Sequence, residues 1–132
     1  MIRSAFVLTL GAATYVFLGL WSLVRPEQVA GMADLGLASA TARTDFLAVY
    51  GGFELGFGLF LAWCLRRTDR RAVGLVALGM ALLGMALGRL LGLVTADGPV
   101  HPLETAILVS ELAGVLLCAW SLRSVGGVVA RP

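Results

Sequence analysis

Four long runs of apolar residues alternate with polar connections along this chain. A helix needs roughly 20 mostly apolar residues to cross the hydrocarbon core of a bilayer, and each run reaches that length. The runs cover approximately residues 4–24, 44–65, 72–95 and 103–122. The pattern therefore predicts an all-α protein, an integral membrane four-helix bundle that forms a single domain over residues 1–132.

Only one connection, residues 25–43, is long. It is too apolar for a flexible linker, and Pro26 suits the first turn of a helix. We therefore expect a short helix from Pro26 to about Leu37 that lies on the outer membrane interface, as a plain connector or as a lid. Ser39 or Thr41 is expected to cap the second long helix.

The placement of arginine predicts how the bundle is oriented. The connection at 66–71 contains four arginines, whereas the other two connections contain only Arg25 and Arg43. Short cytoplasmic loops carry an excess of positive charge, so we expect the 66–71 loop and both termini to be cytoplasmic. The protein would then be a multi-pass protein of a bacterial inner membrane. The arginines that flank the termini agree: Arg3, Arg123 and Arg131.

The composition supports a membrane protein and argues against other classes. The chain is 59% hydrophobic and 14% charged, with a mean hydropathy of +0.93, so it has too few charges to cover the surface of a soluble domain. Its basic residues are scattered or confined to one short loop, which argues against a nucleic-acid partner. Cys64 and Cys118 lack the spacing of a metal or redox pair. We therefore expect no metal, and no cofactor is indicated.

Three ionisable residues lie well inside the predicted spans: Glu54, Arg89 and Glu111. Such a group costs about 2.5–3.5 kcal/mol on insertion scales, so it normally faces the interior of a bundle and finds a partner. Counting along the helices places all three between the outer interface and the midplane, with Glu104 nearer the surface. We expect a polar cluster in the outer half of the bundle.

Helical periodicity turns other polar residues towards this cluster. At about 100° per residue, Arg43, Tyr50 and Glu54 share one face of the second helix. Glu104 and Glu111 are seven residues apart and share one face of the fourth. A stripe of the first helix also faces inward: Ser4, Gly11, Tyr15 and Ser22. The candidate pocket residues are Tyr50, Glu54, Arg89, Glu104 and Glu111, with Arg43 on the same face as Glu54.

One arginine faces two deep carboxylates in this cluster. Arg89 can hold one carboxylate in a bidentate pair, and Glu54 is the expected partner, with Glu111 competing for the same charge. The carboxyl group left over is expected to stay protonated. A purely structural role for the cluster, as polar contacts that fix the helix register, is the alternative.

Glycines recur at four-residue spacing in two of the helices. Gly84, Gly88 and Gly92 form one ridge on the third helix, and Gly52 and Gly56 form another on the second. Gly11 and Gly19 lie eight residues apart on the first helix. Small residues let membrane helices approach closely. We therefore expect these ridges to lie at tight helix crossings.

Three segments resemble an uncharacterised bacterial membrane family, the domain of unknown function 4345. They are ARTDFLAVYGGFELGFGLFL, GMALGRLLGL followed by DGP, and LETAILVSELAG. The similarity covers nearly the whole chain, and its most specific parts are Tyr-Gly-Gly-x-Glu and Gly-Arg-x-x-Gly. The resemblance implies a four-helix inner-membrane protein of the wider DoxX-like set. Some DoxX-like relatives are associated with quinone-linked oxidoreductases, which is an analogy at the level of the fold.

Three functions fit these features. The first is binding of a small lipophilic or lipid-like molecule, such as a quinone, an isoprenoid or a lipid head group, with or without enzymatic chemistry. The second is a non-catalytic structural or accessory subunit of a membrane protein complex. The third is proton- or ion-coupled transport by a homo-oligomer, since four helices make a small unit. The bilayer is a partner in all three.

Overall fold

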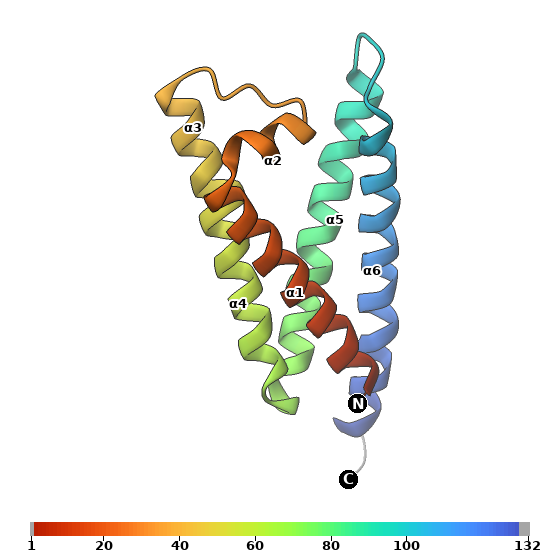
Figure 1. The fold of residues 1–132 in the computed structure, drawn as a ribbon. Helices are drawn as coiled ribbons and strands as arrows, with labels where there is room; N and C mark the ends of the chain where they lie inside the picture. Colours follow the sequence, from red (N-terminus) through yellow and green to blue (C-terminus); the bar gives the residue numbers. More distant parts are fainter. Residues whose placement is uncertain (1, 130–132) are drawn as a thin grey trace.

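The computed structural model describes the backbone of residues 2–129 and the side chains of residues 2–123, so Arg131 lies outside the described residues. Four helices in this part of the chain are long and apolar enough to cross a membrane, and they coincide with the four predicted runs (Figure 1). The elements are α1 (Ile2–Val24), α2 (Pro26–Met32), α3 (Ala40–Phe46), η1 (Leu47–Phe53), α4 (Glu54–Leu65), η2 (Thr68–Arg70), α5 (Arg71–Thr95) and α6 (Pro102–Val129).

The second long helix has three parts, because a π-helical segment, η1, joins α3 to α4 without a break. A π-turn bonds residue i to i+5 and so takes up one more residue than an α-turn, which rotates the faces of everything that follows. The segment reads LAVYGGF and ends directly before Glu54. Periodicity arguments that assume a uniform α-helix therefore fail across residues 47–53.

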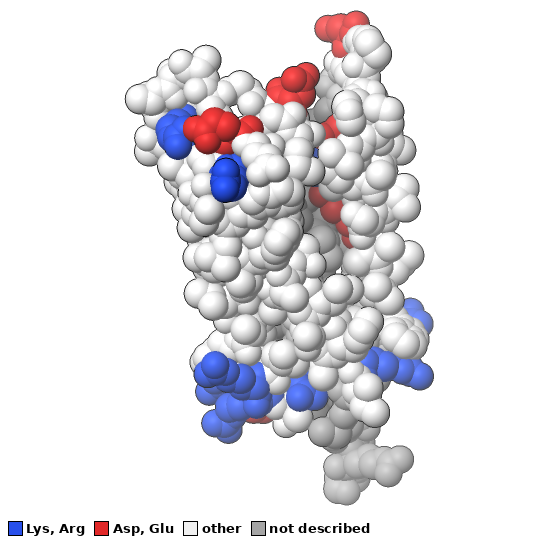
Figure 2. Space-filling view, in the orientation of Figure 1, with Lys and Arg blue, Asp and Glu red and all other residues white. Residues whose placement is uncertain are grey.

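The bundle has two chemically different ends. The start of α1, the end of α6 and the η2 connection lie at one end, which we call the arginine end after Arg66, Arg67, Arg70 and Arg71 (Figure 1). The connections 25–43 and 96–101 lie at the other end, which we call the acidic end. Figure 2 shows basic atoms gathered at the arginine end and most of the visible carboxylates at the acidic end.

The tightly packed core lies towards the arginine end. Leu8, Leu61 and Leu75 from α1, α4 and α5 have no exposed surface, and Cys118 joins them from α6. Each fully buried leucine contributes about 1.5–3 kcal/mol through the hydrophobic effect in water; in lipid the gain comes from close packing instead. The predicted inward stripe of α1 is confirmed, since Ser4, Tyr15 and Ser22 are buried.

Glycines bring α1 and α4 together. A Cβ atom at Gly19 would lie 2.5 Å from the backbone nitrogen of Leu55, and one at Gly58 would lie 2.7 Å from that of Val16. Neither backbone can retreat without moving its helix. Gly19 and Gly58 therefore set the distance between the two helices.

The glycine ridges expected from four-residue spacing are not the sites of close packing. A Cβ atom at Gly56, Gly84, Gly88 or Gly92 would meet nothing within 4 Å, and one at Gly52 would meet only a carbonyl of its own helix. The prediction of tight crossings was wrong at these two ridges. It is confirmed on the first helix, where a Cβ atom at Gly11 would lie 2.7 Å from Leu78 Cδ2 and Gly19 meets the backbone of Leu55. Spacing identifies a smooth helix face, but which face another helix covers depends on the whole bundle.

The four long helices form two pairs. α1 packs along α4, and α5 packs along α6 as an antiparallel hairpin. The pairs converge around the core at the arginine end and diverge towards the acidic end (Figure 1). This divergence separates the polar residues of α4 from those of α5 and α6.

The 25–43 connection contains the expected short helix, but α2 ends at Met32 instead of near Leu37. The chain leaves the helix at Asp34, whose φ of 53° is left-handed, and the Leu35 N–H donates to the Ala30 carbonyl at 2.8 Å. This geometry is a common way to end a helix. Ser39 is the N-cap of α3, as predicted, because its hydroxyl accepts from the Ala42 N–H at 3.0 Å.

Candidate functional site

A cavity of about 580 Å³ opens where the two helix pairs diverge, near the acidic end. Figure 2 shows a hollow between the two halves of the molecule, with acidic side chains visible inside it. Its walls are mostly apolar and aromatic, and they come from α1, η1, α4, α5, α6 and the 96–101 connection. The lining residues are Tyr15, Val49, Tyr50, Phe53, Glu54, Met85, Gly88, Arg89, Gly92, Leu93, Val100 and Glu104.

Arg89 is held by two carboxylates of α6. Its Nη2 donates to Glu111 Oε1 at 3.0 Å and its Nε to Glu111 Oε2 at 3.2 Å, which makes a bidentate pair. Its Nη1 donates to Glu104 Oε2 on the other edge of the guanidinium. Both edges of the cation are therefore engaged within the protein.

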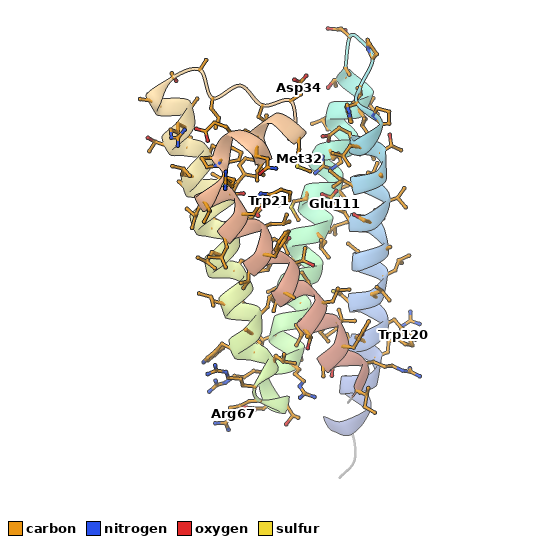
Figure 3. All side chains as sticks on the ribbon, in the orientation of Figure 1. Trp21, Met32, Asp34, Arg67, Glu111 and Trp120 are labelled. Atoms are coloured by element: carbon orange, nitrogen blue, oxygen red, sulfur yellow. The ribbon has the colours of Figure 1, made fainter. Side chains whose placement is uncertain are left out.

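The hairpin of α5 and α6 explains why these three residues meet. Glu104 and Glu111 lie seven residues apart on one face of α6, and Arg89 reaches them from the neighbouring helix. Glu111 lies between α5 and α6 (Figure 3), and its side chain is only 6% exposed. The predicted polar cluster in this half of the bundle thus contains Arg89, Glu104 and Glu111 in direct contact.

Glu54 is not the partner of Arg89, contrary to the sequence-based expectation. It lines the cavity from the start of α4 but makes no ion pair or hydrogen bond with any residue that the structure describes. The physical reason is the divergence of the two helix pairs, since α5 packs closely on α6 and only sparsely on α4. Arg89 therefore pairs with Glu111, and Glu54 has no counter-ion among the residues whose side chains are described.

Arg43 does not line the cavity. Its Nη1 donates to Glu27 of α2, and both side chains are largely exposed. The hydrogen bond from Arg43 lowers the pKa of the Glu27 carboxyl group below its ordinary value. Sequence reasoning placed Arg43 on the face of Glu54 because it extended α-helical geometry through η1, where the structure has a π-helix.

Tyr50 lines the cavity as expected, and its ring stacks on that of Phe46 with centroids 4.8 Å apart. The sequence predicts Tyr15 only as part of the inward stripe of the first helix. It reaches the cavity from α1, where its hydroxyl donates to Met85 Sδ at 3.9 Å and its ring meets Phe57 edge-on. Two aromatic residues with hydroxyl groups therefore enter the site from the two helices of the α1–α4 pair.

A protein-family model described as "Domain of unknown function (DUF4345)" matches residues 4–122. The chain belongs to this family. The matched region includes all the residues that line the cavity. Neither the curated proteins nor the solved structures contain a match to this chain.

Gly88 and Gly92 form part of the wall of the cavity in this DUF4345 protein. Because nothing lies within 4 Å of a Cβ atom at either position, a larger side chain there would project into the open space of the cavity. Gly84, one turn away on α5, also faces open space but does not line the cavity. The four-residue spacing of Gly88 and Gly92 is the feature of the sequence that marks them, but it predicts helix packing and not a cavity wall.

Among the described residues, no group of three His, Cys, Asp or Glu side chains is placed to hold a metal ion. His101 directly precedes α6, and its Nδ1 accepts from the Leu103 N–H at 3.2 Å. The chemistry that the DUF4345 cavity offers to a ligand is thus hydrogen bonding by tyrosine hydroxyls and by the Glu54 carboxyl group, within mostly apolar walls.

Proposed function

We propose that this protein is a multi-pass protein of a bacterial inner membrane that binds a small lipophilic or lipid-like molecule in the cavity near its acidic end. Many large apolar side chains lie on the outside of the helices, among them Phe6, Leu91 and Leu116, which are 64%, 65% and 70% exposed. Such a surface is costly in water and suits lipid.

The arginine end supports the orientation in which both termini are cytoplasmic. Arg70 lies over the ring of Trp63 at 3.9 Å, and Arg3 over that of Trp120 at 4.2 Å. Tryptophan favours the membrane–water interface, so these pairs fit the cytoplasmic surface. The cavity would then lie in the outer half of the bilayer.

The observation that carries the proposal is the combination of an open, mostly apolar cavity with one carboxyl group that has no partner in the described part of the chain. Small-molecule sites are typically about 300–1,000 Å³, apolar, and equipped with a few polar groups; this cavity is about 580 Å³. An ionisable group at this depth is costly, and such groups usually mark functional sites.

Filling the cavity tests the proposal. Gly88→Leu places a side chain in the cavity, whereas Gly84→Leu adds the same side chain one turn away, outside the lining. We expect small lipophilic molecules extracted from the purified protein and measured by mass spectrometry to be retained in Gly84→Leu and lost in Gly88→Leu. Equal recovery from both variants, with both folded, would disprove ligand binding in this cavity.

A second candidate is a non-catalytic subunit of a membrane complex, consistent with membership in the DoxX-like set that we propose from the sequence resemblance. The open faces at Gly56 and Gly84 favour it, because another helix could approach closely there. Native mass spectrometry from a mild detergent would test it. Recovery of the chain without any partner protein would argue against a subunit role.

A further inference from the structure

We propose that the cavity selects a lipophilic cation, that is, an organic ammonium group carried on an apolar body, with Glu54 as its counter-ion. This inference rests on the proposed function and specifies its ligand. It stands on the balance of charges in the cavity, on the aromatic walls and on the distribution of charge between the two ends of the molecule.

The charges around the cavity are unbalanced. Arg89 is the only cation among the described residues that line it, and both of its edges are engaged by Glu104 and Glu111. These three residues together carry a formal charge of −1, and Glu54 adds a further carboxyl group that no described cation reaches. A ligand that brings a positive charge supplies the missing partner, since an unpaired charge in a low-dielectric site is costly.

An anionic head group finds no comparable partner. A phosphate or carboxylate would have to displace Glu104 or Glu111 from Arg89, or sit beside Glu54. Arg43 is engaged by Glu27 and does not line the cavity. The charges around the cavity therefore disfavour an anionic ligand as well as favour a cationic one.

Aromatic rings line the space next to Glu54. Tyr15 of α1 and Tyr50 and Phe53 of η1 contribute rings to the wall. The faces of aromatic rings attract ammonium groups, and quaternary ammonium recognition uses rings in this way. The apolar remainder of the wall, including Met85 and Leu93, suits a hydrocarbon body.

The charge distribution of the whole molecule favours the same ligand. Seven of the eight carboxylates belong to the cavity region and the acidic end, together with three arginines, which gives this half a formal net charge of −4 (Figure 2). The carboxylates are Glu27, Asp34, Asp45, Glu54, Asp97, Glu104 and Glu111, and the arginines are Arg25, Arg43 and Arg89. A field of this sign concentrates cations at the mouth of the cavity.

Three probes with the same decyl chain and different heads test the proposal: decyltrimethylammonium, decanol and decyl sulfate. Their saturable binding is measured on the full chain in nanodiscs of uncharged lipid, with Gly88→Leu as the blocked reference and Gly84→Leu as the control. We expect the cation to bind at least about tenfold more tightly than the sulfate, because only the cation gains a counter-ion and ring contacts.

Glu54→Gln separates charge from shape, since it keeps the size of the side chain. We expect it to weaken binding of the cation about tenfold and to change binding of decanol less than twofold. A melting temperature close to that of the wild type establishes that the variant is folded. If Glu54→Gln lowers the melting temperature strongly, Gly92→Leu serves as a second variant. It narrows the cavity without changing the carboxylate, and it should remove the saturable binding of the cation while leaving any non-saturable binding to the protein surface unchanged.

The outcomes separate this inference from the proposed function. Binding of decanol and decyl sulfate as tight as that of the cation, all of it blocked by Gly88→Leu, would overturn cation selection and leave the binding pocket standing. Binding that Gly88→Leu does not reduce for any probe would overturn both.

The ammonium group can belong to a free amphiphilic amine or to a lipid head group. Nanodiscs that contain a lipid with a primary ammonium head distinguish these sources. Competition with decyltrimethylammonium in such discs assigns the lipid head group, and undiminished binding assigns a free amine; both results support a cation site.

Discussion

Arg89 is the residue on which the polar cluster depends. In the part of the chain that the structure describes, it carries the only positive charge paired with Glu104 and Glu111, and Glu111 is almost fully buried. Removing one partner of a buried ion pair leaves an uncompensated charge, whereas replacing both partners with apolar residues is often tolerated. The three residues should therefore respond to substitution as a unit.

Arg89→Gln is expected to destabilise the protein by about 3 kcal/mol, because it leaves Glu111 buried without a cation. Glu104→Gln, at the more exposed position, should cost less than about 1 kcal/mol. Thermal unfolding in detergent measures both. The double variant Arg89→Leu/Glu111→Leu should recover most of the loss, and failure to recover would show that the arginine stabilises the bundle in some other way.

The exposed pair of Glu27 and Arg43 gives a prediction for pH. Arg43 lowers the pKa of Glu27 in the folded state, so the contact contributes stability above the ordinary glutamate pKa and loses it as the pH falls through the lowered value. An NMR titration of the Glu27 carboxyl carbon should give a lower pKa in the wild type than in Arg43→Gln. Identical titration curves would mean that the pair does not form in solution.

Sequence reasoning identified most of the charged residues of the site but not how they pair. The cost of an ionisable group in an apolar helix marked Glu54, Arg89 and Glu111 without any structure. Pairing depends on distances between helices, which a single-helix pattern does not contain. Because α5 packs against α6, Arg89 pairs with carboxylates of α6 and not with Glu54 of α4.

At the scale of elements, the four long helices were predictable because the length of an apolar run is a strong signal. The π-helical segment η1 was not, since LAVYGGF differs little in composition from the α-helical residues around it. That segment decides which way Tyr50 and Glu54 face relative to Arg43. The hydropathy pattern along the chain does not reveal that one turn contains an extra residue.

The crossing of α1 and α4 gives a prediction at the same scale. Gly58→Ala should destabilise the bundle by about 1–3 kcal/mol, because the added methyl group would lie 2.7 Å from the backbone of Val16. Gly56→Ala is the matched control on the same helix, where nothing lies within 4 Å, and it should be neutral or stabilising by up to about 1 kcal/mol.

Thermal unfolding of the two variants side by side tests this interpretation of the glycines. A loss at position 56 equal to that at position 58 would mean that helix flexibility, and not the close approach of α1, is what the glycines provide.

At the scale of the whole molecule, packing and openness are separated along the bundle. Leu8, Leu61 and Leu75 close the core towards the arginine end, and the cavity lies towards the acidic end. A tight core at one end can hold the fold while the other end remains open to a ligand. Sequence alone placed the polar residues in one half but could not show that this half is hollow.

The proposed orientation can be tested with introduced cysteines, because Cys64 and Cys118 are buried. Gly98→Cys and Thr68→Cys place exposed thiols at opposite ends of the bundle. We expect a membrane-impermeant maleimide added to intact cells to label Gly98→Cys and not Thr68→Cys, with both labelled after permeabilisation. The reverse pattern would invert the topology and place the cavity in the inner leaflet.

The π-helical segment has a consequence for how sequences of this family should be compared. Deleting one residue from a π-turn converts it into an α-turn, whatever the neighbouring residues are. Because the wider turn absorbs one extra residue, a family member one residue shorter between positions 47 and 49 would form an ordinary α-turn there and keep the glutamate of its Tyr-Gly-Gly-x-Glu motif directed at the cavity. A one-residue gap in this segment therefore does not separate members that share the site from those that share only the bundle.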